Sequence, residues 1–420
     1  MSSLGKRLLR IVAWVLGSIV ALILVLVLYI QMRWDAADAR PVRDFTAPTD
    51  SASIARGEYI YKFQAQCWGC HNAPSTSVND PPQGGRVFDL SDIGPGFGKW
   101  YSPNLTPDQE TGLGAWSDGQ IVQALREGLN YKRATLFPIM PVDWYHGMSD
   151  EDVLSVVAYL RSLPPVHNKV PERELSFVTK ALFTFGLMKP KEPITAPVAA
   201  PPRGITPEYG SYIARNVAGC ADCHTPRNLD DGSFYLDSLF AGSSFPFGGG
   251  RKDPIFSFAR NITPDKETGI GGWTEEQFLN AVTMGVRPDS TVLTPHMPYA
   301  YYKSWTMEDL QAVYLYLQTL PAVKRTVPPN AIDPKVTIAE SERGEFLFRS
   351  RCEACHGENG SGAQPTNVKM AEVTASLTDK DLMDFISGGQ MNLKMPLYRN
   401  TLSESELKDV IGYIRSWEKK

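Results

Sequence analysis

The sequence is poor in cysteine and histidine, and it has no excess of charge of either sign. Its 420 residues include six cysteines and six histidines, and 42 basic side chains are balanced by 46 acidic ones. A disulfide scaffold needs more cysteine than this, and without a basic excess we expect no nucleic acid among the partners. With 43% hydrophobic and 21% charged residues the composition is that of a globular protein, and the length predicts two or three domains at about 150 residues each.

Long apolar runs are also rare, and the one that reaches twenty residues lies near the N-terminus. Ile11 to Ile30 carry no charge, and a helix of about twenty residues spans the hydrocarbon core of a bilayer. Basic residues at positions 6, 7 and 10 place the N-terminus in the cytoplasm by the positive-inside rule. We therefore expect a single transmembrane anchor over residues 1–32, in the inner membrane, with the rest of the chain on the periplasmic side. The alternative is a cleaved signal peptide, for which Ala37-Asp38-Ala39 provides a small-residue site.

Most of the remaining chain repeats itself. Asn104 to Asp108 (Asn-Leu-Thr-Pro-Asp) recurs 157 positions later as Asn261 to Asp265 (Asn-Ile-Thr-Pro-Asp), and a Thr-Gly-x-Gly-x-Trp sequence follows each copy. Proline-bearing linkers, Lys189 to Gly204 and Pro328 to Lys335, predict flexible joints between the copies. We expect three domains, named here the first, second and third repeats, at residues 50–175, 205–327 and 337–420.

Helix start signals recur at matching places in the repeats. A Ser or Thr that is followed three residues later by an acid or its amide typically opens a helix, and this pattern occurs at Ser117, Ser149, Thr274, Thr306, Thr378 and Ser403. A tyrosine follows ten residues after the second such signal of each repeat, at Tyr159, Tyr316 and Tyr413. Because no series of alternating strands accompanies these helices, the sequence predicts an all-α fold.

Every cysteine belongs to a Cys-x-x-Cys-His motif. On a helical turn the two thiols and the histidine share one face, so the thiols can bond to the two vinyl groups of a haem while the imidazole lies beneath its iron. Structural zinc usually needs two separated ligand pairs, and a thioredoxin-like redox pair needs a βαβ context. The sequence therefore predicts three covalently bound haem c groups, attached through Cys67, Cys70, Cys220, Cys223, Cys352 and Cys355, with His71, His224 and His356 as axial ligands.

Three of the twelve methionines are followed by proline, and they occupy matching places in the repeats. Met140, Met297 and Met395 precede the three tyrosines named above by 19, 19 and 18 residues. A methionine thioether is the usual sixth ligand in electron-carrying cytochromes c, where it closes the iron to substrates, and we predict that role for all three. The alternatives are core packing for each methionine, His296 as the ligand in the second repeat, and Met391 as the ligand in the third.

Two groups of apolar residues have two interpretations each. Trp116 and Trp273 are either core aromatics or donors to a haem propionate, since a buried indole N–H normally finds an acceptor. The apolar stretch Phe177 to Met188 is either part of the contact with a partner subunit or buried within the first two repeats.

With these motifs the chain resembles the triheme cytochrome c subunits of bacterial membrane-bound dehydrogenases, which serve alcohol, aldehyde, gluconate and fructose dehydrogenase complexes. The resemblance spans residues 50 to 420, and the doubled Asn-Leu/Ile-Thr-Pro-Asp segment is its most specific sign. It implies three class I cytochrome c-like domains. It also implies electron transfer from a dehydrogenase catalytic subunit through the haems to ubiquinone or a terminal oxidase. Family members commonly attach to the membrane near their C-terminus, whereas the apolar run of this chain is N-terminal.

Two other functions remain open on the sequence. The chain is alternatively a cytochrome of a respiratory oxidase or quinol-oxidising complex, or a haem enzyme such as a cytochrome c peroxidase, which needs an open iron position. No dinucleotide-binding, molybdenum-cofactor or quinoprotein signature is visible in the sequence, so we assign no catalytic residue and expect a partner subunit to oxidise the substrate.

Overall fold

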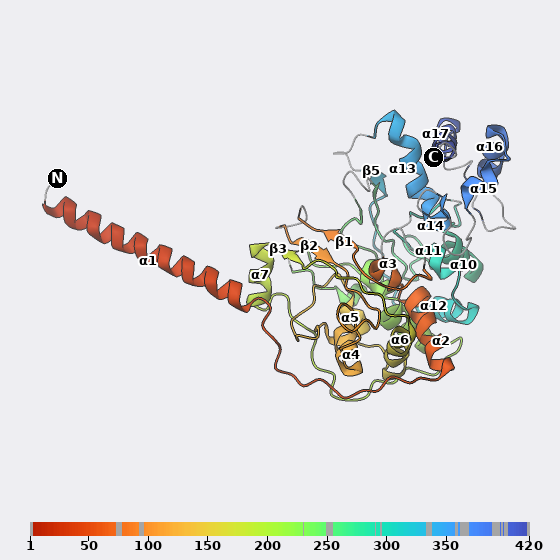
Figure 1. Cartoon of the computed structure of the whole chain (residues 1–420). Coiled ribbons are helices and arrows are strands. Elements are labelled where there is room, and N and C mark those ends of the chain that lie inside the picture. The colour runs from red at the N-terminus through yellow and green to blue at the C-terminus, as the bar shows by residue number, and fades with distance from the viewer. Residues whose placement is uncertain are drawn as a thin grey trace.

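The computed structural model of the chain shows one long helix that projects from a body containing the three repeats (Figure 1). The structure describes residues 3–72, 78–91, 96–229, 231–248, 255–289, 291–294, 296–332, 338–357, 360–361, 369–388, 395, 398 and 402–417. The long helix is α1 (Ser3–Arg33), whose apolar side chains are largely exposed. Within the described ranges it is the one helix long and apolar enough to cross a membrane, and such a helix near an N-terminus fits an anchor or a signal sequence.

The first and second repeats have the same order of helices. Each opens with a helix that ends in a π-helical turn, continues with a short helix that bears the motif histidine, and closes on a long helix. The first repeat contains α2 (Ser51–Tyr59), η1 (Ile60–Gln64), α3 (Trp68–His71), α4 (Asp118–Glu127), α5 (Val142–Tyr145) and α6 (Asp150–Ser162). The second contains α8 (Pro207–Tyr212), η2 (Ile213–Val217), α9 (Cys220–His224), η3 (Leu236–Ser238), α10 (Glu275–Met284), α11 (Tyr299–Tyr302) and α12 (Met307–Thr319). Between them, α7 (Phe177–Thr184) lies at the base of α1 (Figure 1).

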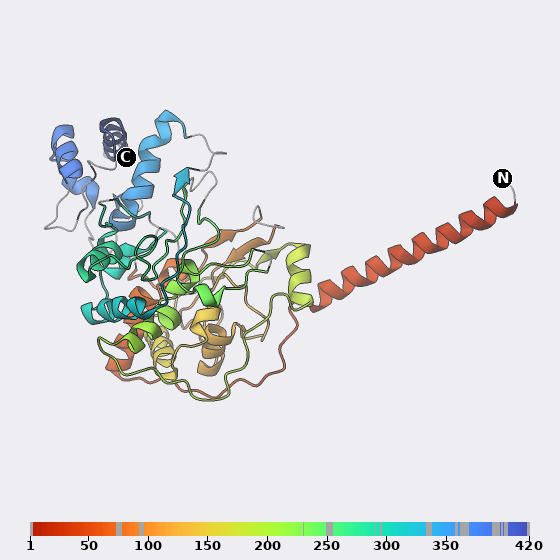
Figure 2. The same ribbon diagram turned by 180° about the vertical axis from the view of Figure 1, so that it is seen from behind.

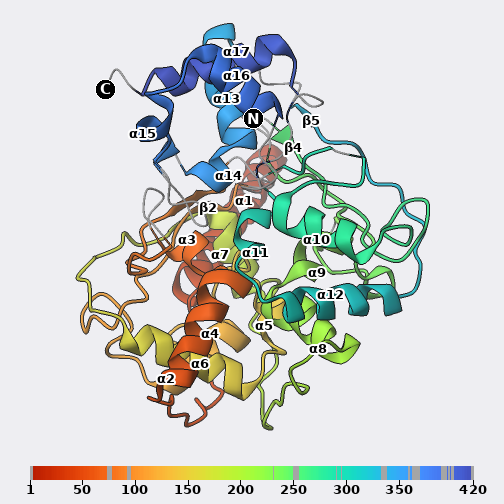
Figure 3. The same cartoon turned by 90° about the vertical axis from the view of Figure 1, so that its right-hand side faces the viewer.

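The third repeat forms its own group of helices at the end of the body away from α1 (Figures 1 and 2). Figure 3 shows this group stacked on the helices of the first two repeats. Its elements are η4 (Glu340–Glu342), α13 (Arg343–Arg351), α14 (Glu353–His356), α15 (Met370–Thr374), α16 (Asp379–Gly388) and α17 (Glu404–Arg415). Here the first helix runs directly to Cys352, without the π-helical turn of the other two repeats.

All six predicted helix starts are confirmed. The hydroxyl of each cap residue accepts a hydrogen bond from the backbone N–H three residues later, at Ser117, Ser149, Thr274, Thr306, Thr378 and Ser403. The caps at Ser117, Thr274 and Ser403 are complete capping boxes, in which the residue three positions later also accepts from the cap backbone. These caps satisfy backbone donors that the first turn of a helix would otherwise leave without partners.

In each repeat the first helix crosses the last one at a glycine. The crossing pairs are α2 with α6, α8 with α12, and α13 with α17. The glycines are Gly57, Gly210 and Gly344, and a Cβ at any of them would collide with a backbone carbonyl of the opposite helix. The glycines therefore set how closely the two helices approach, because only a residue without a Cβ fits at the crossing.

The prediction of an all-α fold is wrong in one respect, because short strands are present. β1 (Val87–Asp89), β2 (Gly98–Tyr101) and β3 (Glu174–Leu175) form an antiparallel sheet in that order, with Val87 opposite Tyr101 and Gly98 opposite Leu175. β4 (Ile255–Phe256) of the second repeat pairs with β5 (Ala331–Ile332), which lies in the linker after that repeat. Strands of two to four residues are too short for the alternating pattern by which strands are recognised in a sequence.

The first two repeats share one hydrophobic core, whereas the third repeat has its own. The shared core contains Tyr159 of α6 and Tyr316 of α12 together with side chains from both π-helical turns. The core of the third repeat contains Phe348 of α13 and Ile414 of α17, and Val292 of the second repeat packs into it. The first two repeats therefore form one packed unit, to which the third is joined through a smaller contact.

Two tyrosines tie the first two repeats together by a reciprocal exchange. Tyr59 of the first repeat donates to Asp309 of the second over 2.7 Å, and Tyr212 of the second donates to Asp152 of the first over 2.7 Å. Both aspartates are buried, and Asp152 also forms an ion pair with Arg56 at 2.9 Å. Removing such a partner from a buried carboxylate costs free energy of folding. These bonds therefore hold the two repeats in one arrangement.

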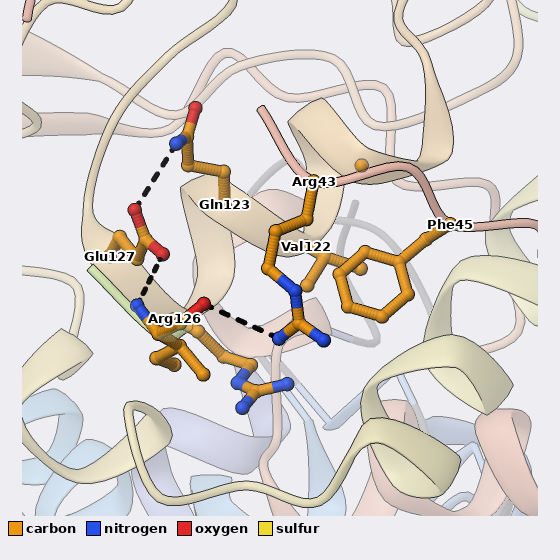
Figure 4. A pocket seen from close by; sticks show the side chains of 8 residues that line it. Arg43, Phe45, Val122, Gln123, Arg126 and Glu127 are labelled. Atoms are coloured by element: carbon orange, nitrogen blue, oxygen red, sulfur yellow. Dashed lines mark hydrogen bonds between the residues drawn. The ribbon is translucent and has the colours of Figure 1, made fainter. Parts of the chain in front are cut away.

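The linker after the first repeat is not the flexible joint that its composition predicts. Figure 4 shows a shallow pocket beside α4 in which Arg43 and Glu127 bind the linker backbone. Glu127 accepts from the N–H of Ile194 at 3.0 Å, Arg43 donates to the Ile194 carbonyl at 3.4 Å, and the N–H of Asp150 donates to the carbonyl of Val198 at 2.8 Å. The linker is thus fixed along the surface of the first repeat by its own backbone groups.

Replacement of Gly344 by alanine tests the role of the crossing glycines. We expect Gly344→Ala to lower the free energy of unfolding of the third repeat by about 1–3 kcal/mol, because the added methyl group forces α13 away from the carbonyl of Asp409. Gly412→Ala in α17 is the matched control, since a Cβ there has nothing within 4 Å, and alanine should stabilise that helix by up to about 1 kcal/mol. Chemical denaturation followed by circular dichroism measures both, and equal effects of the two substitutions would contradict this role.

Candidate haem sites

The structure folds the Cys-x-x-Cys-His motifs into single helical turns. In the first repeat the N–H groups of Cys70 and His71 both donate to the carbonyl of Cys67, over 3.1 and 3.0 Å. In the third, the N–H of His356 donates to the carbonyl of Cys352 over 2.9 Å. The second motif lies within α9. Each turn brings the first cysteine and the histidine onto one side, as the motif requires. The side chain of Cys355 lies outside the described residues.

Backbone carbonyls orient the histidines of the first two motifs. Nδ1 of His71 lies 3.2 Å from the carbonyl oxygen of Pro103, and Nδ1 of His224 lies 2.7 Å from that of Arg260. Because a carbonyl only accepts, Nδ1 carries the proton and Nε2 keeps its lone pair for a metal. Burial lowers the pKa of His71 to about 4 and also lowers that of His224. Both rings are therefore neutral at neutral pH, which is the state that can ligate iron.

The repeated Asn-Leu/Ile-Thr-Pro-Asp segment holds these carbonyls in place, a role that sequence reasoning missed. Pro103 directly precedes Asn104, whose side-chain amide donates to Thr111 at 3.1 Å and to the carbonyl of Val166 at 2.8 Å. Its oxygen accepts from the N–H of Thr106 at 3.0 Å. The second repeat has the same bonds around Asn261. The segment thus forms a buried hydrogen-bond network next to the histidine. Its occurrence in two copies is the sequence feature from which this role could have been inferred.

The thiols of the first two motifs are uncharged, although Cys70 is exposed and the other three cysteines are only partly buried. The described cysteines are free of disulfide bonds, and burial raises the pKa of the thiols of Cys67, Cys220 and Cys223 to about 12 and also raises that of Cys70. Reactive redox cysteines and zinc-binding thiolates have lowered pKa values instead. Protonated thiols in an apolar setting, next to a neutral imidazole with a free Nε2, fit covalent attachment of a haem through thioether bonds.

The three Met-Pro methionines lie at corresponding places against the cores. Met140 is partly buried against the shared core just before α5, and Met297 is partly buried against the same core just before α11. Met395 packs against the core of the third repeat. Nδ1 of His296 lies 2.9 Å from the hydroxyl of Ser257, and Met391 lies outside the described residues. Ligation by the three methionines stays a prediction.

Comparison with known proteins agrees with these sites. The cytochrome c family model matches residues 54–164, and the model for subunit III of cbb3-type cytochrome c oxidase matches residues 339–414. The chain contains cytochrome c domains.

Relatives of the cytochrome chain extend this likeness over most of its length. It is 27% identical over 393 residues to the cytochrome c subunit of the quinone alcohol dehydrogenase of Gluconobacter oxydans, which covers 87% of this chain and 78% of the relative. It is 27% identical over 356 residues to the fructose dehydrogenase cytochrome subunit of Gluconobacter japonicus, covering 78% and 68%. The gluconate 2-dehydrogenase cytochrome c subunit of Pantoea cypripedii is 26% identical over 402 residues, which cover 88% of this chain and 86% of the relative. The predicted resemblance to dehydrogenase cytochrome subunits is therefore confirmed.

The two repeated tryptophans of the cytochrome lie beside the shared core. Trp116 and Trp273 are partly buried against it, and the ring of Trp116 lies 5.3 Å from that of Tyr131. Their carbonyls accept hydrogen bonds from the closing helices: Trp116 from Arg161, and Trp273 from Tyr314 at 3.1 Å. Both tryptophans therefore contribute to the packing around the core. A hydrogen bond from either to a haem propionate stays a prediction.

The two haem motifs of the first pair of repeats face each other across their interface. Trp144, four residues after Met140, donates through Nε1 to Asp222 at 3.1 Å, and Asp222 lies between the two cysteines of the second motif. In the reverse direction Tyr301, four residues after Met297, packs its ring 4.9 Å from Trp68, which lies between the cysteines of the first motif. Each motif is therefore in direct contact with the methionine loop of the other repeat, a name used here for the Met-Pro methionine and the short helix after it, residues 140–145 and 297–302.

Two buried tyrosines lie between the motifs. Tyr145 donates from its hydroxyl to the carbonyl of Ala65 at 3.2 Å, and Tyr302 is its equivalent in the second repeat. Burial raises the pKa of both far above the ordinary value, with smaller contributions from Cys67 near Tyr145 and from Cys220 near Tyr302. Both tyrosines therefore stay neutral and occupy the space between the two thiol pairs.

Asn104→Ala tests the network behind His71. Because Asn104 is buried and makes three of the bonds described above, we expect a loss of about 1–3 kcal/mol in the free energy of unfolding. We also expect a shift in the midpoint potential of one haem, since Pro103 moves relative to His71. The control is Glu110→Ala in the same loop, whose side chain is 82% exposed. Thermal unfolding and redox titration measure the two effects, and an unchanged potential would show that the network has no influence on the histidine.

Proposed function

We propose that the chain is the membrane-anchored electron-transfer subunit of a dehydrogenase complex. In this proposal three covalent haems accept electrons from a catalytic partner and pass them to ubiquinone or a terminal oxidase. The observation that carries the proposal is the similarity to dehydrogenase cytochrome subunits over 87% of the chain, together with two histidine sites of matching geometry.

A c-type haem supplies a one-electron couple at its iron, and the chain's own residues hold and tune it. His71, His224 and His356 are the proposed axial ligands on one side, and Met140, Met297 and Met395 on the other. Burial lowers the pKa of His356 to about 4, so its ring is neutral like those of the other two. Six-coordinate irons carry electrons but do not bind substrate, which supports a carrier over a peroxidase.

The contacts between each motif and the helix after the Met-Pro methionine of the other repeat support rapid transfer within that pair. Trp144, Tyr145 and Tyr302 are buried at this interface, and the reciprocal bonds fix its geometry. The third repeat contacts the pair through a separate core at the end away from α1 (Figure 1). In this proposal the third site belongs to a group of helices separate from the pair that follows α1 in the chain.

A cytochrome of a respiratory oxidase or of a quinol-oxidising complex is the second candidate. It is favoured by the match of residues 339–414 to subunit III of cbb3-type oxidase and by a 34% identical stretch of 88 residues in a cytochrome bc1 complex subunit. The first match covers only the third repeat, and the second covers 88 residues, about the length of one repeat. The dehydrogenase subunits, in contrast, match across the repeats. The longer similarity therefore favours a dehydrogenase partner.

Purification from membranes in mild detergent tests the proposal. We expect the chain to retain residues 1–32, to carry three covalent haems by intact mass, and to co-purify with a dehydrogenase whose substrate reduces those haems. Two haems would contradict the ligand assignment. Co-purification with an oxidase alone would replace the dehydrogenase proposal by the second candidate, and loss of the N-terminal residues would replace the anchor by a signal peptide.

Methionine substitutions test the ligands and the pairing together. We expect Met395→Ala to lower the midpoint potential of one haem by on the order of 100 mV, because axial ligands set haem potentials over about 0.8 V. Met140→Ala should move two midpoints, since its loop contacts the second motif. Met383→Ala is the matched control, because Met383 packs against the same core as Met395 but precedes no proline. Equal effects of Met383→Ala and Met395→Ala would assign Met395 to core packing.

A further inference from the structure

Three sides of α7 have different surroundings. Thr179 and Phe183, one turn apart, are buried against the first repeat, where Phe183 lies 6.3 Å from the ring of Trp100. A second side faces α1. The third side and the turn that follows expose large apolar side chains: Phe177 at 43%, Val178 at 41%, Phe185 at 56% and Leu187 at 74%. The stretch Phe177 to Met188 is therefore partly buried against the first repeat and partly exposed, and contact with a partner subunit stays a prediction.

The side of α7 that faces α1 is bonded to the place where the apolar run of α1 ends. Lys180 donates to the side chain of Gln31 at 2.9 Å, and the hydroxyl of Thr184 donates to the carbonyl of Ile30 at 3.5 Å. Ile30 is 2% exposed, in contrast to the other apolar residues of α1. Contacts between α1 and α7 thus fix α7 at the level where α1 leaves the hydrocarbon core if it spans a bilayer.

The surroundings of this junction have the chemistry of a membrane interface. The guanidinium of Arg173 lies 4.7 Å from the ring of Trp34, and the ammonium of Lys180 lies 5.5 Å from the same ring. Tryptophan and basic side chains are typical of the headgroup level, where the ring lies at the boundary and the cations reach phosphate. Lys189, exposed just after Leu187, adds a further positive charge.

We infer that the exposed side of α7 and the turn after it, residues 177–187, rest in the lipid headgroup and acyl boundary beside α1. This inference rests on the part of the proposed function in which α1 is a membrane anchor. The occupant is lipid because the exposed side continues the lipid-facing surface of α1 at its end and is bordered by basic groups. Amphipathic segments bind the interface through buried apolar area and attraction to anionic lipid. A second contact beside the span limits rotation of the first repeat, so its haem site keeps a fixed orientation toward an acceptor in the membrane.

Photo-crosslinking of the full chain tests the inference. The photoreactive residue p-benzoylphenylalanine replaces Phe185, and as a matched control it replaces Val373, an apolar residue of α15 that is 48% exposed and lies at the end of the body away from α1 (Figure 1). The protein is reconstituted in nanodiscs of phosphatidylethanolamine and phosphatidylglycerol and irradiated. We expect phospholipid adducts by mass spectrometry at position 185 and none above background at position 373.

The outcomes separate this inference from the proposed function. Absence of lipid adducts at position 185, or equal adducts at both positions, overturns the inference. In native membranes, an adduct of position 185 with another protein overturns it in favour of a subunit contact. The intact mass of the same samples reports independently whether residues 1–32 are retained. Cleavage of the proposed anchor is therefore distinguished from an absence of lipid contact at position 185. If the Phe185 variant loses its haem spectrum, the same probe at Leu187, which is more exposed, gives the result.

Discussion

The close crossing of the first and last helices in each repeat is the constraint on which the rest of the structure depends. At Gly57, Gly210 and Gly344 the first helix lies directly on a carbonyl of the last, and the first cysteine of each motif follows within ten residues. The crossing therefore determines where the chain leaves the first helix and where the thiols and the histidine lie relative to the core. In the first two repeats the first cysteine lies ten residues after the glycine, whereas in the third repeat it lies eight residues after it. The π-helical turns η1 and η2 occupy that extra length, consistent with the frequent use of such turns at functional sites.

The same crossings explain why the first two repeats bind each other so firmly. Tyr59 and Tyr212 lie on the helices that contain the crossing glycines, and each reaches a buried aspartate on the closing helix of the other repeat. Asp152 and Asp309 sit in the first turns of those closing helices, where the positive end of the helix dipole also favours a carboxylate. The linker between these two repeats is hydrogen-bonded to Glu127 on the surface of the first repeat, so it does not let the two repeats move relative to each other. The pair is thus held by side-chain bonds and a shared core, and the third repeat lacks an equivalent exchange among its described residues.

Much of this arrangement could be predicted from sequence, and the exceptions have physical reasons. Caps such as Ser117 and Ser403 are local signals, because the bonding partner is three residues away, and the structure agrees with them. The strands escaped prediction because two to four residues carry no alternating pattern. The rigid linker also escaped it, since its proline content is the same whether its carbonyls face water or Arg43. The repeated segment at Asn104 was visible as a pattern, but its function depends on Pro103 lying beside His71, a contact 32 residues apart that only the fold creates.

The three repeats therefore differ in how they are joined, and this difference bears on electron transfer. Trp144 of α5 in the first repeat donates to Asp222 in the motif of the second, so in the proposed function the first two sites are in contact through protein groups. The third repeat has a core of its own, but Lys303 of the second repeat lies close enough to help lower the pKa of His356. At the opposite end, α7 and α1 fix the first repeat against what we propose to be the bilayer. In the proposed function the first two repeats therefore act as one unit, and the third adds a site with a separate hydrophobic core.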